Sequence, residues 1–110
     1  MITCHEFEKV EMRVGTILGV QDFLKANKPA YQLTIDFGSE LGIKKSSAQI
    51  TKRYTKEDLF GKQIIAVINF PKKQIADFMS ECLVLGSVGE ENDIVLLTTD
   101  LPVKNGLRIG

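Results

Sequence analysis

The chain has 110 residues, of which 44% are hydrophobic and 25% are charged, with 14 basic residues against 14 acidic ones. A chain of this length can bury a core without disulfides, and its composition is typical of a globular protein. The zero net charge argues against a strongly basic nucleic-acid binder, although a basic face can lie opposite an acidic one.

We expect a cytoplasmic protein that does not insert into a membrane. No apolar stretch reaches the ~20 residues that span a bilayer, and residues 1–10 lack the apolar core of a signal peptide. Cys4 and Cys82 lie far apart in the chain, outside any CxxC pair. We therefore expect both to be reduced thiols.

The N-terminal part of the chain predicts a helical turn or two at residues 7–10, followed by a strand over residues 12–20. A period of two, which is typical of half-buried strands, dominates this strand and the chain as a whole. Gly15 and Gly19 within it indicate a bulge or tight curvature. Alternation places five of its side chains on one face: Met12, Val14, Thr16, Leu18 and Val20.

The middle of the chain predicts two further strands, over residues 31–37 and 44–50, and a short helix. The helix is expected to begin after Thr55, whose hydroxyl forms a capping box with Asp58, and to end at Gly61. In the strand over 44–50, alternation places Lys45, Ser47 and Gln49 on one face and Ser46, Ala48 and Ile50 on the other.

The C-terminal half predicts a strand buried on both faces at residues 63–68, because this run is almost wholly apolar. Shorter strands are expected at 81–85 and 94–97, joined by an acidic loop at 86–93. Asn105-Gly106 indicates a tight turn in a terminal hairpin or arm. A short helix between the third and fourth strands is the layout of the OB-fold. We therefore predict an all-β, five-stranded OB-fold β-barrel with short helices and terminal extensions, as one domain over residues 1–110.

Catalytic and metal-binding patterns are nearly absent from the sequence. His5 is the only histidine, so a Ser/His/Asp or Cys/His arrangement has to be built on it. Cys4, His5 and Glu6 lack the second ligand cluster of a zinc site, and no phosphate-binding glycine loop occurs. We predict a binding protein that is not an enzyme and uses no cofactor or metal.

The basic residues are distributed unevenly. No acid occurs between Leu41 and Lys56, and Lys72 and Lys73 form a second basic pair after the buried strand. These charges are either solvated loop residues or a face that binds polyanions beside the groove of the barrel. Phe70, at the end of the buried strand, is either a core residue or a ring that stacks on a base or grips an apolar peptide side chain. From the residues alone we select six candidate ligand-binding side chains: Lys45, Lys52, Arg53, Phe70, Lys72 and Lys73.

Five segments together resemble the CsaA proteins, which are export-related chaperones within the wider tRNA-binding-domain family. The resemblance covers residues 7–110. It is carried by residues 12–17 (MRVGTI), 35–38 (IDFG), 46–51 (SSAQIT), 69–71 (NFP) and 80–85 (SECLVL).

The resemblance implies an OB-fold homodimer held by its N- and C-terminal extensions. It also implies binding of unfolded or presecretory polypeptides and of the SecA translocation ATPase, or, as in the wider family, binding of tRNA. The ligand remains open between polypeptide and tRNA at this point. Five further residues are carried over by motif to the binding surface: Ser47, Gln49, Asn69, Ser80 and Glu81.

Overall fold

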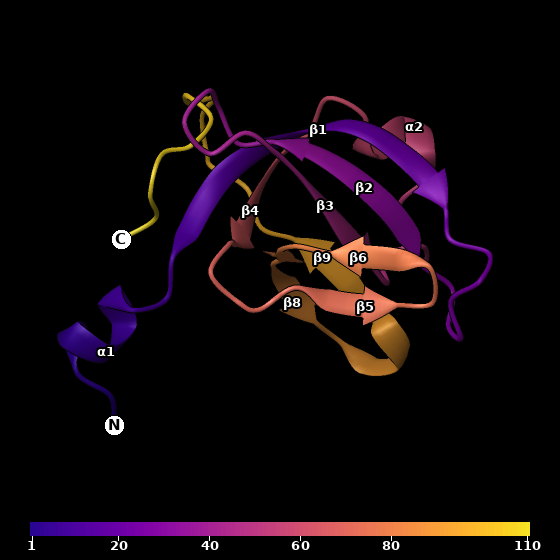
Figure 1. Ribbon diagram of the computed structural model, residues 1–110, viewed down its shortest axis with the longest axis horizontal. Helices are drawn as coiled ribbons and strands as arrows, with labels where there is room; N and C mark the ends of the chain where they lie inside the picture. Colours follow the sequence, from indigo (N-terminus) through magenta and orange to yellow (C-terminus); the bar gives the residue numbers. More distant parts are fainter.

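Strands dominate the computed structural model, which describes residues 1–110 (Figure 1). Its central sheet contains β1 (Met12–Asp22), β2 (Tyr31–Asp36), β3 (Ile43–Ala48), β4 (Gln63–Val67) and β7 (Leu83–Val84). The two hairpins are β5 (Lys73–Ile75) with β6 (Phe78–Ser80), and β8 (Gly86–Val88) with β9 (Ile94–Leu96). The helices are α1 (Cys4–Glu8), α2 (Lys56–Leu59) and the short 3₁₀ turn η1 (Glu90–Asn92). No helix is long and apolar enough to cross a membrane.

The central sheet curls into a nearly closed barrel. Its strand order is β3-β2-β1-β4-β7, and every neighbouring pair is antiparallel. Residues 80–82, just before β7, return to the free edge of β3 and form hydrogen bonds with it. The predicted all-β, five-stranded OB-fold barrel is confirmed.

The bulge predicted in the first strand is present and changes which side chains face inward. The register with β2 shifts between Ile17 and Gly19, so that Leu18 is an extra residue without an opposite partner. An extra residue moves the alternation to the other face. Ile17, before the bulge, and Val20, after it, therefore both contact the main core, while Leu18 is exposed. The expectation that Val20 shares a face with Val14 was wrong for this reason, because Val14 does not belong to the main core.

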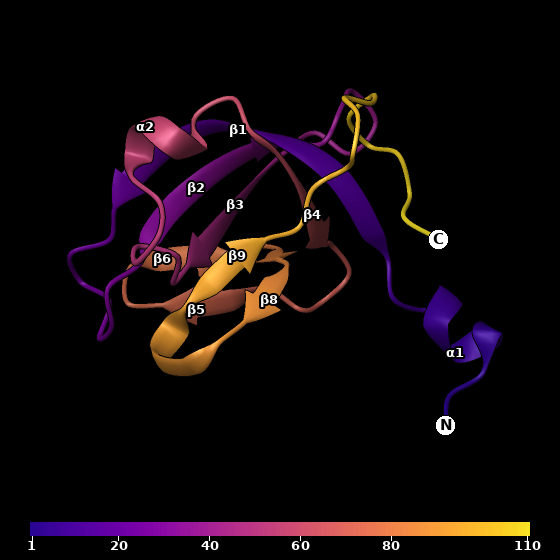
Figure 2. The same ribbon diagram turned by 180° about the vertical axis from the view of Figure 1, so that it is seen from behind.

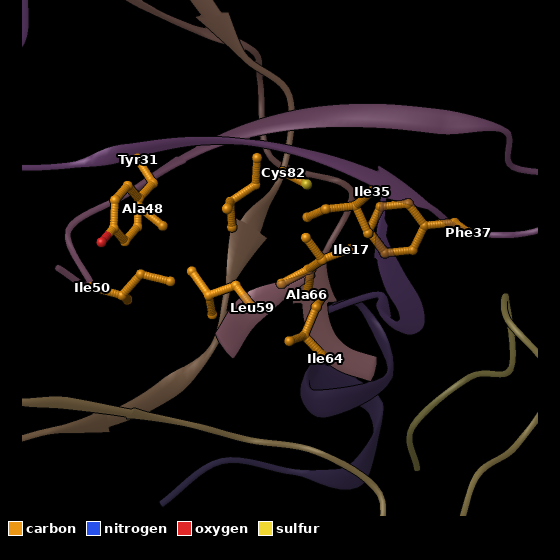
Figure 3. Close-up of a cluster of buried hydrophobic side chains, with 11 residues drawn as sticks. Ile17, Tyr31, Ile35, Phe37, Ala48, Ile50, Leu59, Ile64, Ala66 and Cys82 are labelled. Atoms are coloured by element: carbon orange, nitrogen blue, oxygen red, sulfur yellow. The ribbon is translucent and has the colours of Figure 1, made fainter. Parts of the chain in front are cut away.

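The barrel interior holds one main core of apolar side chains, drawn in Figure 3. β2 supplies it through regular alternation, with Tyr31, Leu33 and Ile35 buried. β4 is buried along its last four residues, as predicted for a strand covered on both faces. α2 closes one end of the barrel with Leu59, which is fully buried. The predicted capping box of Thr55 with Asp58 is present, and Gly61 follows in the left-handed region.

Several boundaries differ from those predicted. α1 lies three residues earlier than expected, and the strand expected at 81–85 is reduced to two residues. Lys73, expected in a loop, lies in β5. The segment expected as one acidic loop contains β8 and η1. The Asn105-Gly106 turn belongs to an arm, because the backbone around residues 106–109 bonds to Met12 and Val14 of β1.

A second, smaller core fixes the β5–β6 hairpin. Phe78 of β6 packs with Phe23 and Ala30, which flank the loop after β1. The Phe23 and Phe78 rings are 5.4 Å apart in a tilted arrangement, which is a favourable geometry for aromatic pairs. The hairpin and the loop of residues 24–29 are thereby joined into one wall beside the barrel.

Candidate binding groove

An open groove of about 530 Å³ lies beside the barrel, between the end of β3 and the two hairpins. Figures 1 and 2 show both hairpins on the same side of the central sheet. Ten of the 18 residues that line the groove are hydrophobic. Such a surface suits apolar side chains, with a few polar groups to orient them.

The outward face of β3 contributes polar side chains to this groove. Ser46, Ala48 and Ile50 are buried, while Lys45 and Gln49 are exposed and Ser47 is half-buried. The predicted alternation of this strand is therefore confirmed. Ser47 and Gln49 line the groove, whereas Lys45 lies outside it.

Ser80 and Glu81 also line the groove, but their polar atoms hold the barrel together. The Glu81 N–H donates to the Lys45 carbonyl oxygen at 2.7 Å, and the Lys45 N–H donates to Glu81 Oε1 at 2.9 Å. The Ser47 N–H donates to Ser80 Oγ at 3.0 Å. These side chains are engaged with β3 and support the groove wall.

Phe70 and Asn69 follow β4 but point to different partners. Phe70 lines the groove and is 54% exposed, so it is not a core residue. The Asn69 side chain accepts a hydrogen bond from the Glu11 N–H at 3.0 Å and donates to the Lys9 carbonyl oxygen at 2.7 Å. Asn69 therefore fastens the N-terminal segment and does not line the groove.

The basic residues predicted for a polyanion-binding face are partly neutralised. Arg53 pairs with Asp93, which raises the pKa of the guanidinium and lowers the pKa of the carboxyl. The Nζ atom of Lys72 lies 3.4 Å from Oε2 of Glu81. Lys45, Lys52 and Lys73 have no ion pair. Of the predicted basic residues, Lys73 lines the groove, and Lys52 and Arg53 do not.

A second, polar pocket of about 450 Å³ adjoins the groove. It lies between residues 26–30 and β5, and it shares Ser47, Gln49, Lys73 and Ile75 with the groove. No sequence pattern indicated this pocket. Its wall depends on the packing of Phe78, which lies far along the chain from residues 26–30.

Sequence reasoning also missed most of the apolar lining of the groove. These residues come from the end of β3, the segment around β7 and the β8–β9 hairpin, where strand prediction was weakest. They include Ile50, Leu83, Val84, Leu85, Val88 and Ile94.

Reactive and metal-ligating groups do not gather in the structure. No cluster of three or more His, Cys, Asp or Glu side chains has the arrangement of a metal site. Both cysteines are free; Cys4 is exposed, and Cys82 is buried. Burial raises the pKa of the Cys82 thiol to about 11, so this group is protonated at neutral pH.

The barrel and its groove define an OB-fold domain with an open, partly apolar groove beside the sheet. The model of the family described as "Putative tRNA binding domain" matches residues 12–108. The chain belongs to this family.

Solved structures place the chain near the CsaA chaperones within that family. Chaperone CsaA from Bacillus anthracis str. Ames has a TM-score of 0.95 at 51% identity, over 100% of this chain and 99% of that one. The CsaA chaperone protein from Picrophilus torridus has a TM-score of 0.93 at 52% identity, over the whole of both chains. The resemblance to CsaA proteins is thereby confirmed.

Curated relatives include much longer enzymes. The methionine–tRNA ligase of Thermococcus onnurineus is 34% identical over 104 residues, which are 94% of this chain but 14% of the ligase. The chain therefore spans about a seventh of that relative. A MetRS-related protein from Pyrococcus horikoshii has a TM-score of 0.87 at 24% identity and shares the fold.

Proposed function

We propose that this protein is a non-catalytic, cytoplasmic binding protein that holds apolar segments of unfolded or presecretory polypeptides in the groove. The observation that carries this proposal is the apolar lining of the groove, which is open along one side of the barrel. An extended chain could lay apolar side chains against Ile50, Ile75 and Leu83 and a larger one against Phe70. The likeness to CsaA chaperones over the full chain supports the same ligand.

Binding of tRNA is the second candidate, favoured by the family and by the unpaired lysines. Lys44, Lys45 and Lys52 lie in one stretch without ion pairs, and Lys73 adds a further charge at the groove. Phosphate contacts give a strong salt dependence that declines by about one unit of log–log slope for each lysine removed. Unchanged tRNA affinity after charge reversal of both Lys52 and Arg53 would contradict this candidate.

A homodimer is part of the proposal, with residues 1–110 as one binding unit in each protomer. α1 has no buried residue and extends away from the barrel in both views (Figures 1 and 2). Phe7 and Val10 are each 38% exposed beside the C-terminal arm, where Leu107 is 48% exposed. Because a five-residue helix is not stable alone, contact with a second copy explains its conformation. SecA binding, which the resemblance implies, belongs to the same proposal.

Sedimentation tests the dimer separately from ligand binding. At micromolar concentration the protein should sediment as a dimer, and Phe7→Glu should shift it toward the monomer. If the wild-type protein sediments as a monomer, the homodimer is contradicted, while the proposed polypeptide binding in the groove is unaffected. In a dimer, two grooves could bind one extended chain with increased avidity.

Polypeptide binding is tested with a fluorescently labelled, reduced and unfolded model protein in 0.3 M salt, where surface charge attraction is screened. Wild type should bind, and Phe70→Ala should weaken binding about fivefold or more, because it removes an aromatic contact in the groove. Phe60→Ala is the matched control, since Phe60 is 68% exposed and outside the groove. No binding by wild type, or equal loss in both variants, would contradict the proposal.

A further inference from the structure

We propose that the groove continues into a basic pocket around Lys28 and Lys73 that binds an acidic side chain of the polypeptide held in the groove. This inference rests on the polypeptide binding proposed above and specifies which polypeptides are preferred. The pocket measures about 450 Å³ and shares four lining residues with the groove. A ligand that lies along Ser47 and Gln49 therefore passes directly from one into the other.

The groove and the pocket together form one continuous path for a ligand, and the charges along this path are unevenly placed. The pocket is lined by two lysines and by no aspartate or glutamate, and neither Lys28 nor Lys73 has an ion pair. The acid of the groove, Glu81, is 3.4 Å from Lys72 and accepts the Lys45 N–H. The uncompensated charges are therefore positive and lie at one end of the path.

The neighbouring acid Asp77 is also neutralised. Its carboxylate lies 2.9 Å from Lys25 Nζ, and this pairing lowers the pKa of Asp77. Asp77 thus remains ionised and paired with Lys25, while Lys28 and Lys73 are left free. Asn27, Ser47 and Gln49 add polar side chains to the same pocket, and such groups can donate hydrogen bonds to a carboxylate.

The pocket wall is held in place by the second core. The Phe23 N–H donates to the Ala30 carbonyl oxygen at 3.1 Å, which closes the loop that carries Lys28. Phe78 packs on both of these residues from the neighbouring hairpin. The backbones that carry Lys28 and Lys73 therefore belong to one packed unit, and both side chains are exposed.

A polypeptide fits this path better than a polynucleotide. A polynucleotide would place phosphates along its whole length, including over the apolar part of the groove and beside Glu81. A polypeptide can carry apolar side chains in one part and a carboxylate a few residues further on, since an extended chain advances about 3.3 Å per residue. The ligand class that matches is an apolar segment followed or preceded by aspartate or glutamate.

The test compares labelled peptides with one shared apolar segment and amidated C-termini, in 50 mM NaCl. One pair carries two aspartates or two asparagines after the segment, and a second pair carries them before it. For one position we expect the aspartate peptide to bind about three- to tenfold more tightly than its asparagine counterpart, as two partly exposed ion pairs would give. The difference should shrink in 0.5 M NaCl because of screening.

Variants assign the effect to the pocket. Lys28→Gln combined with Lys73→Gln should abolish the preference for aspartate. Lys28→Gln alone, at a residue that lines the pocket but not the groove, should reduce the preference while leaving the affinity for the asparagine peptides nearly unchanged. Lys62→Gln is the matched control, because Lys62 is an exposed lysine that lines neither the groove nor the pocket. A peptide with asparagines and a free terminal carboxylate separates side-chain recognition from recognition of the chain end.

The outcomes separate this inference from the proposed function. If the asparagine peptides bind but aspartate gives no gain, or the gain survives the double variant, the basic pocket is overturned and the groove stands. A gain only from the free terminal carboxylate also overturns it. If no peptide binds while a tRNA binds and is weakened by the double variant, both the polypeptide function and this inference fail.

Discussion

Lys45 and Glu81 form a reciprocal pair of hydrogen bonds across the gap in the barrel. The Glu81 N–H donates to the Lys45 carbonyl oxygen, and the Lys45 N–H donates to the Glu81 carboxylate, at 2.7 and 2.9 Å. The Ser46 hydroxyl, which is fully buried, donates to the Cys82 carbonyl oxygen at 2.8 Å in the same seam. Side chains predicted to bind ligand therefore complete the sheet where strand pairing is interrupted.

Glu81→Ala should lower the free energy of unfolding by about 1–2 kcal/mol, because it removes the acceptor of the hydrogen bond from the Lys45 N–H. Glu81→Gln keeps an oxygen acceptor and loses the 3.4 Å contact with Lys72, which is exposed and contributes little. Its loss should stay below about 0.5 kcal/mol. Urea unfolding measures both values, and equal losses would show that the carboxylate acts through its charge.

Asn69→Ala should loosen the N-terminal segment without weakening peptide binding. The variant loses both hydrogen bonds that hold Lys9 and Glu11, each worth about 0.5–1.5 kcal/mol. Hydrogen exchange at the Glu11 amide should become faster, and groove affinity should change less than twofold. A large loss of affinity with unchanged exchange would place Asn69 at the ligand instead.

The two thiols should differ in reactivity. In the native protein a thiol reagent such as DTNB should modify one thiol per chain, Cys4, and in urea it should modify two. Burial holds the pKa of Cys82 at about 11, so the reactive thiolate is scarce as well as covered. Rapid modification of both thiols under native conditions would contradict this.

The same pKa predicts a loss of stability in alkaline solution. The ordinary value is 9.0 and the folded value is about 11, so between these pH values the unfolded state releases its proton first. Stability from this group is therefore complete below pH 9 and is lost as the pH rises to 11. Urea midpoints measured at pH 8 to 11 should decline less steeply for Cys82→Ala than for wild type.

Asp58 should contribute the opposite dependence in acid. The Thr55 N–H donates to its carboxylate at 3.0 Å, and this backbone hydrogen bond is the main cause of its lowered pKa. As the pH falls, the unfolded state binds the proton first, so stability present above the ordinary value of 3.8 is lost below it. Asp58→Asn should flatten the decline of the urea midpoint between pH 6 and 3. Glu57→Gln, which removes an exposed carboxylate of α2 outside the Thr55 capping box, is the matched control.

The two glycines of β1 should respond differently to alanine. A Cβ at Gly15 would lie 2.6 Å from Ile35 Cγ2 and 2.8 Å from the Phe37 ring, whereas at Gly19 its nearest neighbour is 3.7 Å away. Gly15→Ala should lower the free energy of unfolding by about 1–3 kcal/mol through overpacking. Gly19→Ala should be neutral or slightly stabilising, because glycine weakens a strand. Similar values for both in thermal unfolding would refute the packing argument.

The local sequence pattern was sufficient to predict structure where burial alternates every two residues or where a helix cap lies within four residues. The alternation of β2, the two-faced burial of β4 and the capping box of Thr55 and Asp58 were all predicted correctly. The prediction failed where neighbours distant in sequence decide. Val20 packs against the main core because Leu18 forms a bulge opposite β2, and β5 with β6 was missed because Phe78 packs on the loop after β1.

The hydrogen bonds between Lys45 and Glu81 separate what the sequence determines from what only the tertiary structure determines. The sequence alone determined that a polar face of β3 and the segment at residues 80–85 belong together as family motifs, and that the chain forms an OB barrel. Only the tertiary structure decided that the side chains of Ser80 and Glu81 form hydrogen bonds with the backbone of β3. It also decided that the Asn69 side chain bonds to the N-terminal segment and that Arg53 pairs with Asp93. Hydrogen bonds and ion pairs between distant residues depend on barrel closure, and residue type and spacing do not specify which partner lies across the gap.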